Sequence, residues 1–129
     1  MVTFVLDYSS GVPIYRQIID QIRFGIASGQ LKLGEQLPTV RALAVELKVN
    51  LNTVSKAYRE LEIKNILETQ QGSGTFVNET KQLVLDKERE DKLTEICTQY
   101  SAIAHSYGFS IDEVIQKLHI LETQKNNKL

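Results

Sequence analysis

The stretch TVRALAVELKVNLNTVSKAYRELE, residues 39–62, decides the fold. It contains two runs of apolar residues at helical spacing, and each run follows a good N-cap, Thr39 or Asn50. Residues 48–50 provide a tight turn between the runs. The stretch therefore predicts two helices joined by a turn. The apolar positions are Val40, Leu43, Ala44 and Leu47 in the first helix, and Val54, Ala57, Tyr58 and Leu61 in the second.

The flanking segments predict another helix and a hairpin. Pro13 suits the first turn of a helix that carries an isoleucine every four residues and ends near residues 28–29. Asn65 can adopt the left-handed conformation that ends the third helix. Two short segments, residues 66–69 and 75–77, flank a Gly-rich turn and predict a β-hairpin. This order of elements is that of a winged helix-turn-helix, mainly α with a small β-hairpin.

The 129-residue chain changes character near residues 78–81, since both prolines and six of the seven glycines come before that point. We expect residues 1–78 to form the winged helix-turn-helix domain and residues 79–129 to form a helical extension. Fifteen basic and sixteen acidic residues give a net charge of −1, which excludes a general polyanion binder. Any binding of nucleic acid must therefore come from the placement of a few charges.

The extension predicts two amphipathic helices joined by a short turn. The first is expected from about Thr80 to Ser106, and a capping box of Ser110 and Glu113 opens the second. Each apolar stripe is too wide to be buried by the other helix alone, so we expect this two-helix hairpin to form a homodimer. A helix of that length spans about 40 Å, which predicts widely spaced inverted half-sites on DNA.

Several classes of protein are excluded by what the sequence lacks. The apolar runs are far shorter than the roughly 20 residues of a membrane span, and the first residues do not resemble a signal peptide. The lone Cys97 excludes an internal disulfide and a Cys-rich zinc site, in keeping with a cytoplasmic location. No set of catalytic residues stands out. We expect no enzyme, no cofactor, no metal and no membrane partner.

A helix-turn-helix offers the N-terminal residues of its second helix to base edges in the major groove. Asparagine can pair with adenine there, and Leu or Thr methyl groups can contact thymine. Basic residues one turn further along face phosphates, and the N–H groups at the start of the preceding helix also attract phosphate. The candidate DNA-binding residues of the two helices are Thr39, Arg41, Asn50, Leu51, Asn52, Thr53, Lys56 and Arg59.

The same residues resemble the GntR family of bacterial transcription regulators, continuously over about residues 10–78. The residues at the start of the recognition helix and the short C-terminal part are most similar to the YtrA-like subfamily. The matching stretches are PIYRQI at 13–18, LPTVRALA at 37–44, VNLNTVSKAYRELE at 49–62 and GSGTFV at 72–77.

The resemblance implies a dimeric regulator of transcription, a repressor, bound to a double-stranded DNA operator. It implies that a wing glycine enters the minor groove, which adds Gly72, Ser73 and Gly74 to the candidate site. It also implies that the two C-terminal helices serve dimerisation and that the regulated genes lie beside ABC transporter genes. Leu51 stands where relatives tend to have Pro or Arg. The residues at 70–71 are Gln where Arg is common, so we expect a weaker attraction to the minor groove.

Simpler interpretations stand beside these. Gly72 and Gly74 can serve the turn alone, although the wing is the better interpretation in this order of helices. Tyr15 is either a phosphate ligand or a staple onto the core, and the sequence favours neither.

Two other functions compete with the DNA-binding one. A winged helix can serve as a protein-interaction module, which the near-neutral charge allows. A sensor gated by a small-molecule effector or a metal can use the C-terminal helices, where Cys97, His105 and His119 lie. Cys97 and His105 are eight residues apart on one predicted helix, about 12 Å, too far to share one ion. A buried thiol and two ordinary histidines are the preferred interpretation.

Overall fold

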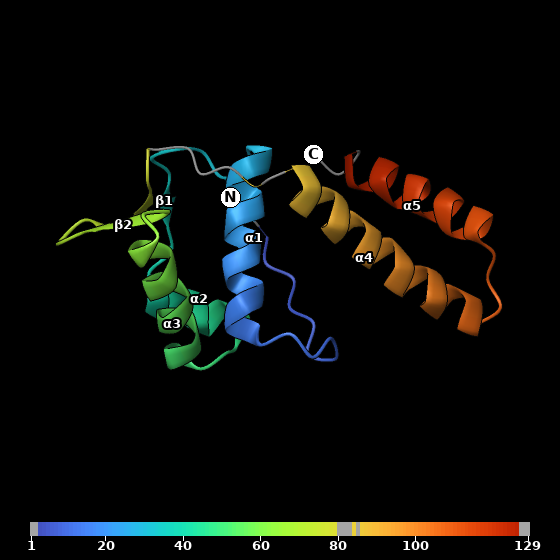
Figure 1. The fold of residues 1–129 in the computed structure, drawn as a ribbon, viewed down its shortest axis with the longest axis horizontal. Helices are drawn as coiled ribbons and strands as arrows, with labels where there is room; N and C mark the ends of the chain where they lie inside the picture. Colours follow the sequence, from blue (N-terminus) through green and yellow to red (C-terminus); the bar gives the residue numbers. More distant parts are fainter. Residues whose placement is uncertain (1–2, 80–83, 85, 127–129) are drawn as a thin grey trace. The chain divides into compact units, whose positions relative to one another are not determined.

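The computed structural model describes residues 3–79, 84 and 86–126. The chain forms two units that divide between Val84 and Leu85. The first unit contains three helices and three short strands, and the second contains two helices (Figure 1). No helix among the described residues is long and apolar enough to cross a membrane.

The first unit is a winged helix-turn-helix, as the sequence predicts. Its elements are α1 (Ile14–Ser28), β1 (Gln36–Leu37), α2 (Val40–Leu47), α3 (Leu51–Ile63), β2 (Leu67–Gln70) and β3 (Gly74–Val77). The sequence does not predict β1, because two residues are too few to show an alternating pattern. This strand pairs antiparallel with β3, so the sheet has three strands in the order β1-β3-β2. The hairpin of β2 and β3 projects away from the helices (Figure 1).

The predicted helix caps are present. Thr39 Oγ1 accepts a hydrogen bond from the Ala42 N–H at 3.0 Å, and Asn50 Oδ1 accepts one from the Asn52 N–H at 2.7 Å. Asn65 has φ 60°, the left-handed conformation expected after α3. Lys48 at φ 58° is a second left-handed residue, which the sequence does not predict. Pro13 lies at the N-cap position, immediately before the first helical residue.

The core lies between the three helices and the sheet. Leu31 and Ile66 in the connecting segments are also buried, whereas Phe76 in β3 is only half-buried. The fully buried side chains come from every helix of the unit and from the hairpin, so one continuous core holds the recognition helix in place. The largest of them are Ile18, Ile19, Ile22, Leu31, Leu43, Val54, Tyr58, Leu61, Leu67 and Val77.

Two glutamines of α1 bind the N-terminal segment to the helix surface. Gln21 accepts a hydrogen bond from the Val5 N–H at 3.0 Å and donates one to the Val5 carbonyl at 2.7 Å. Gln17, which is buried, makes the same pair of bonds with the backbone of Asp7 at 2.9 and 2.8 Å. The segment is therefore held through its backbone along the start of α1, and the Phe4 and Leu6 side chains pack against the core.

The second unit consists of α4 (Asp86–Ser106) and α5 (Ile111–Asn126). The expected start near Thr80 is wrong, because Val84 is not helical and the helix begins at Asp86; Thr80 itself lies outside the described residues. With 21 residues α4 is about 31 Å long, so it does not support the wide half-site spacing predicted from a longer helix.

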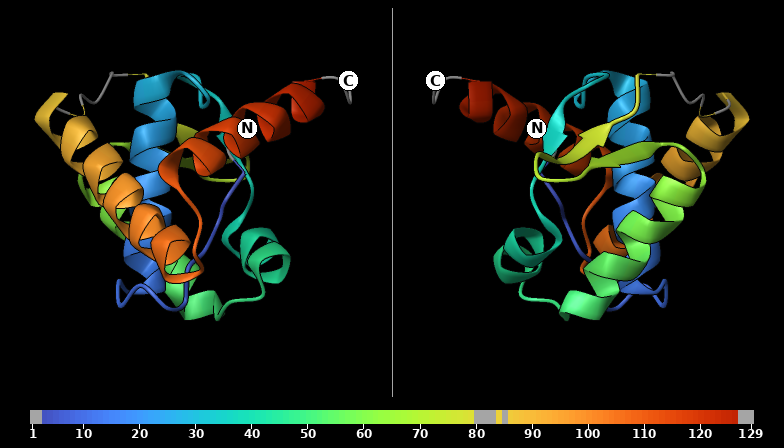
Figure 2. Two further views of the ribbon diagram at one scale, coloured as in Figure 1. Left: turned by 90° about the vertical axis from the view of Figure 1, so that its right-hand side faces the viewer. Right: turned by 90° about the vertical axis from the view of Figure 1, so that its left-hand side faces the viewer.

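The turn between α4 and α5 is built as predicted. Gly108 has φ 85°, and the Ser110–Glu113 capping box is present, with reciprocal bonds of 3.3 and 3.2 Å. The two helices diverge from this turn (Figure 2). Neither contains a buried residue, so α4 and α5 do not bury each other's apolar stripes.

Candidate nucleic-acid interface

The exposed face of α3 is polar and basic toward its N-terminal half. Core packing buries the opposite face, on which Val54, Ala57, Tyr58 and Leu61 lie. Asn52, Lys56 and Arg59 are exposed at positions i, i+4 and i+7, so they share one side of the helix. Leu51 is also exposed, and Thr53 is half-buried beside them.

The two asparagines at the start of α3 have different tasks. The amide oxygen of Asn50 already accepts the cap hydrogen bond, which fixes the orientation of this side chain. The Asn52 side chain has no hydrogen-bond partner among the described residues, so its acceptor and its donors are both free. Bidentate pairing with adenine requires one of each. Asn52 is therefore the better placed of the two to read a base, whereas the sequence did not distinguish them.

The start of α2 presents Thr39 and Arg41 on the surface. The Thr39 oxygen accepts the cap bond, but its hydroxyl hydrogen is still available to a phosphate oxygen. Arg41 is exposed in the first turn, close to the free N–H groups of the helix. The segment that joins α2 and α3 is only Lys48 to Asn50, so the two groups of candidate residues lie on neighbouring helices of one compact motif.

A buried tyrosine braces this motif from inside. The Tyr58 hydroxyl on α3 donates a hydrogen bond of 2.7 Å to the carbonyl of Pro38, the residue before the α2 N-cap. Burial, and secondarily the nearby Glu46 carboxylate, raise the pKa of the Tyr58 phenol above its ordinary value, so the phenol keeps its proton and remains a donor. The sequence assigned Tyr58 to the core, but no local pattern predicted this bond between α3 and the segment before α2.

The wing tip is a glycine turn without charge. The Ser73 N–H donates to the Gln70 carbonyl at 3.0 Å, and Gly72 at φ 82° supplies the positive φ that the turn requires. The Gln36 side chain from β1 donates a hydrogen bond to the Ser73 carbonyl at 3.0 Å. Its amide nitrogen would lie only 2.6 Å from a Cβ atom at Gly74, so a side chain at this position would have to displace Gln36. Gln36 thus anchors the wing, a role that was not predicted because β1 was not.

Tyr15, at the start of α1, lies at the edge of the same surface. Its ring is half-buried and packs against the core. The Lys56 ammonium lies over the ring, 3.9 Å from its centroid, and the Arg16 guanidinium carbon is 5.8 Å from the centroid. The structure therefore brings the first turn of α1 to the side of the recognition helix.

Comparison with known proteins matches this arrangement. The sequence pattern described as "Bacterial regulatory proteins, gntR family" matches residues 14–77, which span α1 to β3. The HTH-type transcriptional repressor YtrA of Bacillus subtilis is 38% identical over 109 residues, which cover 84% of each chain. The chain belongs to the GntR family.

Solved structures of similar proteins extend over both units of this GntR-family chain. A transcriptional antiterminator from Listeria monocytogenes EGD-e is 34% identical, with a TM-score of 0.59 and coverage of 96% of this chain and 92% of the other. YtrA from Sulfolobus acidocaldarius, a GntR-family transcription factor, is 36% identical, with a TM-score of 0.54 and coverage of 95% and 98%. The chain is thus a transcription regulator with a DNA-binding winged helix, and its relatives are regulators and not enzymes.

In the alternative function of a metal-gated sensor, the histidines and the cysteine of the second unit would be the ligands of the metal. Cys97, His105 and His119 are all exposed, whereas a buried thiol was expected. Within the described part of the chain, no three His, Cys, Asp or Glu side chains are grouped so that they can hold a metal ion.

Proposed function

We propose that this GntR-family regulator is a cytoplasmic repressor that binds a double-stranded DNA operator as a homodimer. The observation that carries the proposal is the exposed face of α3, on which a free amide and two cations are aligned on a helix held rigidly by the core. Such a face offers hydrogen-bonding groups to base edges and charges to the flanking phosphates. By analogy with YtrA-like proteins, a transporter operon is the proposed target.

The candidate residues divide into readers of bases and holders of phosphates. We assign base contacts to Asn52, Thr53 and Leu51 at the start of α3, and Asn50 keeps its place in the site as the cap that orients this turn. The wing residues Gly72, Ser73 and Gly74 approach the minor groove through their backbone. Phosphate contacts belong to Thr39, Arg41, Lys56 and Arg59.

The homodimer is inferred from the open apolar faces of the second unit. Leu118 is 60% exposed and Leu93 is 56% exposed, and α4 and α5 bury no residue in the single chain. Exposed apolar surface of this extent on two helices favours association with a like surface. The exposed large side chains are Leu93, Ile96, Tyr100, Ile103, Tyr107, Phe109, Ile111, Ile115, Leu118, Ile120 and Leu121.

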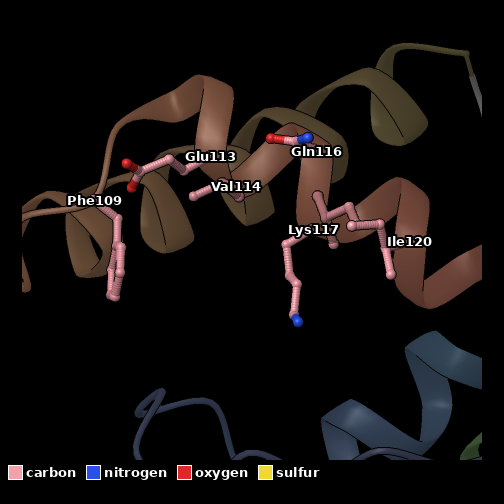
Figure 3. Close-up of a pocket in the computed structure, with 7 residues that line it drawn as sticks. Phe109, Glu113, Val114, Gln116, Lys117 and Ile120 are labelled. Carbon is pink, nitrogen blue, oxygen red and sulfur yellow. The ribbon is translucent and has the colours of Figure 1, made fainter.

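One part of this surface is hollowed. Phe109, Lys117 and Ile120 point to the same side of α5, whereas Gln116 points to another (Figure 3). All residues that line the hollow come from α5 and the turn before it, so it is an open face of one helix and not an enclosed pocket. We assign it to the proposed contact between subunits, and a bound effector is the alternative use of the same face.

The test is selection of bound duplexes from a random pool at near-physiological salt, followed by sequencing. We expect an enriched inverted repeat, because two identical reading heads related by twofold symmetry contact equivalent half-sites. An enriched single half-site would contradict the dimeric mode of binding. Recovery of no sequence, with or without transporter substrates as candidate effectors, would favour the protein-interaction module.

A further inference from the structure

We propose that Tyr15 is a positioning residue for DNA binding, and that its ring holds the Lys56 ammonium at the edge of the recognition face. With Arg16 beside the same ring, this gives a phosphate clamp that α1 and α3 build together. The inference rests on the proposed function, because it assumes that Lys56 contacts the DNA backbone.

The geometry places two cationic side chains, one from α1 and one from α3, around one ring. The Lys56 nitrogen is 3.9 Å from the Tyr15 centroid, well within the roughly 6 Å over which a cation interacts with an aromatic face. The Arg16 guanidinium carbon is 5.8 Å from the same centroid, near the limit of that range. α1 and α3 pack side by side and begin at the same end of the unit (Figures 1 and 2).

The Tyr15 ring is itself held in place, so it can restrict the position of the Lys56 side chain. Tyr15 is half-buried and packs against the core cluster. Gln17, two residues further along α1, bonds to the backbone of Asp7 and to the Val12 carbonyl at 2.9 Å, which secures the chain on either side of Pro13. A fixed ring beside a flexible lysine reduces the number of conformations that the lysine explores, and this lowers the entropy lost when it binds.

The two cations remain available to an anion. Neither Lys56 nor Arg16 forms an ion pair with a carboxylate in the part of the chain that the structure describes. A ring face engages an ammonium from one side only, so the remaining N–H groups of Lys56 can donate to phosphate oxygens. Two unneutralised cations around one ring, next to the base-reading residues of α3, form the kind of site that phosphate favours.

Nuclear magnetic resonance of the full chain without DNA tests the contact. A tyrosine ring shields protons above its face, so we expect the Lys56 ε-methylene protons to resonate upfield of those of the other lysines. Tyr15→Phe keeps the ring and is expected to keep this shift, whereas Tyr15→Leu is expected to abolish it. Absence of the shift in the native chain would overturn the inference and would leave the proposed function untouched.

A double-mutant cycle on operator binding tests the role. Tyr15→Leu is expected to weaken binding by about two- to fivefold for each reading head, the range expected when an exposed cation–π contact is lost. In a Lys56→Met background the same change is expected to have no further effect, and Tyr15→Phe is expected to bind like the native protein. Tyr8→Leu, which removes a tyrosine that is 70% exposed, is the matched control and should change nothing.

The other outcomes of the cycle are each decisive. Additive losses from Tyr15→Leu and Lys56→Met would show that Tyr15 acts without Lys56, and an equal loss in Tyr15→Phe would show that the hydroxyl contacts DNA directly; either result overturns the positioning role. If Lys56→Met itself leaves operator and random DNA binding unchanged, the phosphate role of Lys56 in the proposed function fails instead. Thermal unfolding of each variant separates these effects from loss of folding.

Discussion

Asn52 and Lys56 lie one turn apart on the exposed face of α3, and we expect their substitutions to have different effects on DNA binding. Asn52→Ala removes a group that distinguishes bases, so it should lower the preference for operator over random DNA by about 1–3 kcal/mol. Lys56→Ala should weaken binding to both DNAs alike and lower the slope of log K against log salt by about 1. Titrations of the operator and of a random duplex at several salt concentrations measure both effects. If Asn52→Ala loses as much affinity for random DNA as for the operator, the assigned roles are contradicted.

Tyr58 gives a prediction that depends on pH. Tyr58→Phe removes the hydrogen bond to Pro38 and should lower the free energy of unfolding by about 1 kcal/mol near neutral pH. The pKa of the phenol is raised in the folded state above the ordinary 10.0, so the unfolded chain releases this proton first as the pH rises. The contribution of Tyr58 is therefore complete below about pH 10 and declines above it. Urea unfolding should show a difference between native protein and variant that shrinks above that pH; a constant difference would contradict the prediction.

At the scale of the element, the wing depends on the contact between β1 and the hairpin. Gly74→Ala places a Cβ 2.6 Å from the Gln36 amide nitrogen, at a residue with φ 126°, so it must both strain the backbone and displace the wing anchor. We expect a loss of roughly 1–3 kcal/mol in the free energy of unfolding. Gly72→Ala, at φ 82° with open space around the new Cβ, is the control and should cost less. Equal losses in denaturant unfolding would show that Gln36 does not constrain the wing.

The helices and strands differ in how well the sequence predicts them. The three helices of the first unit follow from local signals: apolar spacing, the caps at Thr39 and Asn50, and the left-handed Asn65. β1 does not, because its two residues acquire a strand conformation only by pairing with β3. The sequence predicts the start of α4 six residues too early, because the charged segment before Leu93 has no periodicity to mark where the helix begins.

The candidate site divides in the same way. The side chains on the face of α3 follow from position along one helix, which a sequence shows directly. Three contacts hold the candidate site in position: Tyr58 with Pro38, Gln36 with Ser73, and Lys56 with Tyr15. Each joins residues 20 to 41 positions apart in the sequence, so no local pattern specifies it. The exposure of the candidate DNA-contacting residues on one face of α3 was thus predictable, and the contacts that hold the site in position were not.

At the scale of the whole molecule, the proposed homodimer is tested by one substitution in α5. Leu118→Glu puts a charge on the exposed apolar stripe, and we expect it to convert a dimer into a monomer in sedimentation experiments at micromolar concentration. Operator binding should weaken by at least tenfold because the two reading heads are no longer linked. Thr123→Glu adds the same charge on α5 at an exposed residue that does not line the hollow, and it should leave the dimer intact. A native chain that sediments as a monomer would contradict the assignment of these helices to dimerisation.

The way in which the N-terminal segment is held bears on how this protein tolerates change over evolutionary time. Gln17 and Gln21 bind the N–H and carbonyl groups of Asp7 and Val5, which every residue other than proline supplies. The side chains of Val5 and Tyr8 point into solvent, at 71% and 70% exposure. Val5 and Tyr8 can therefore change without loss of these bonds, whereas substitution of Gln17 or Gln21 would release the backbone that each of them binds.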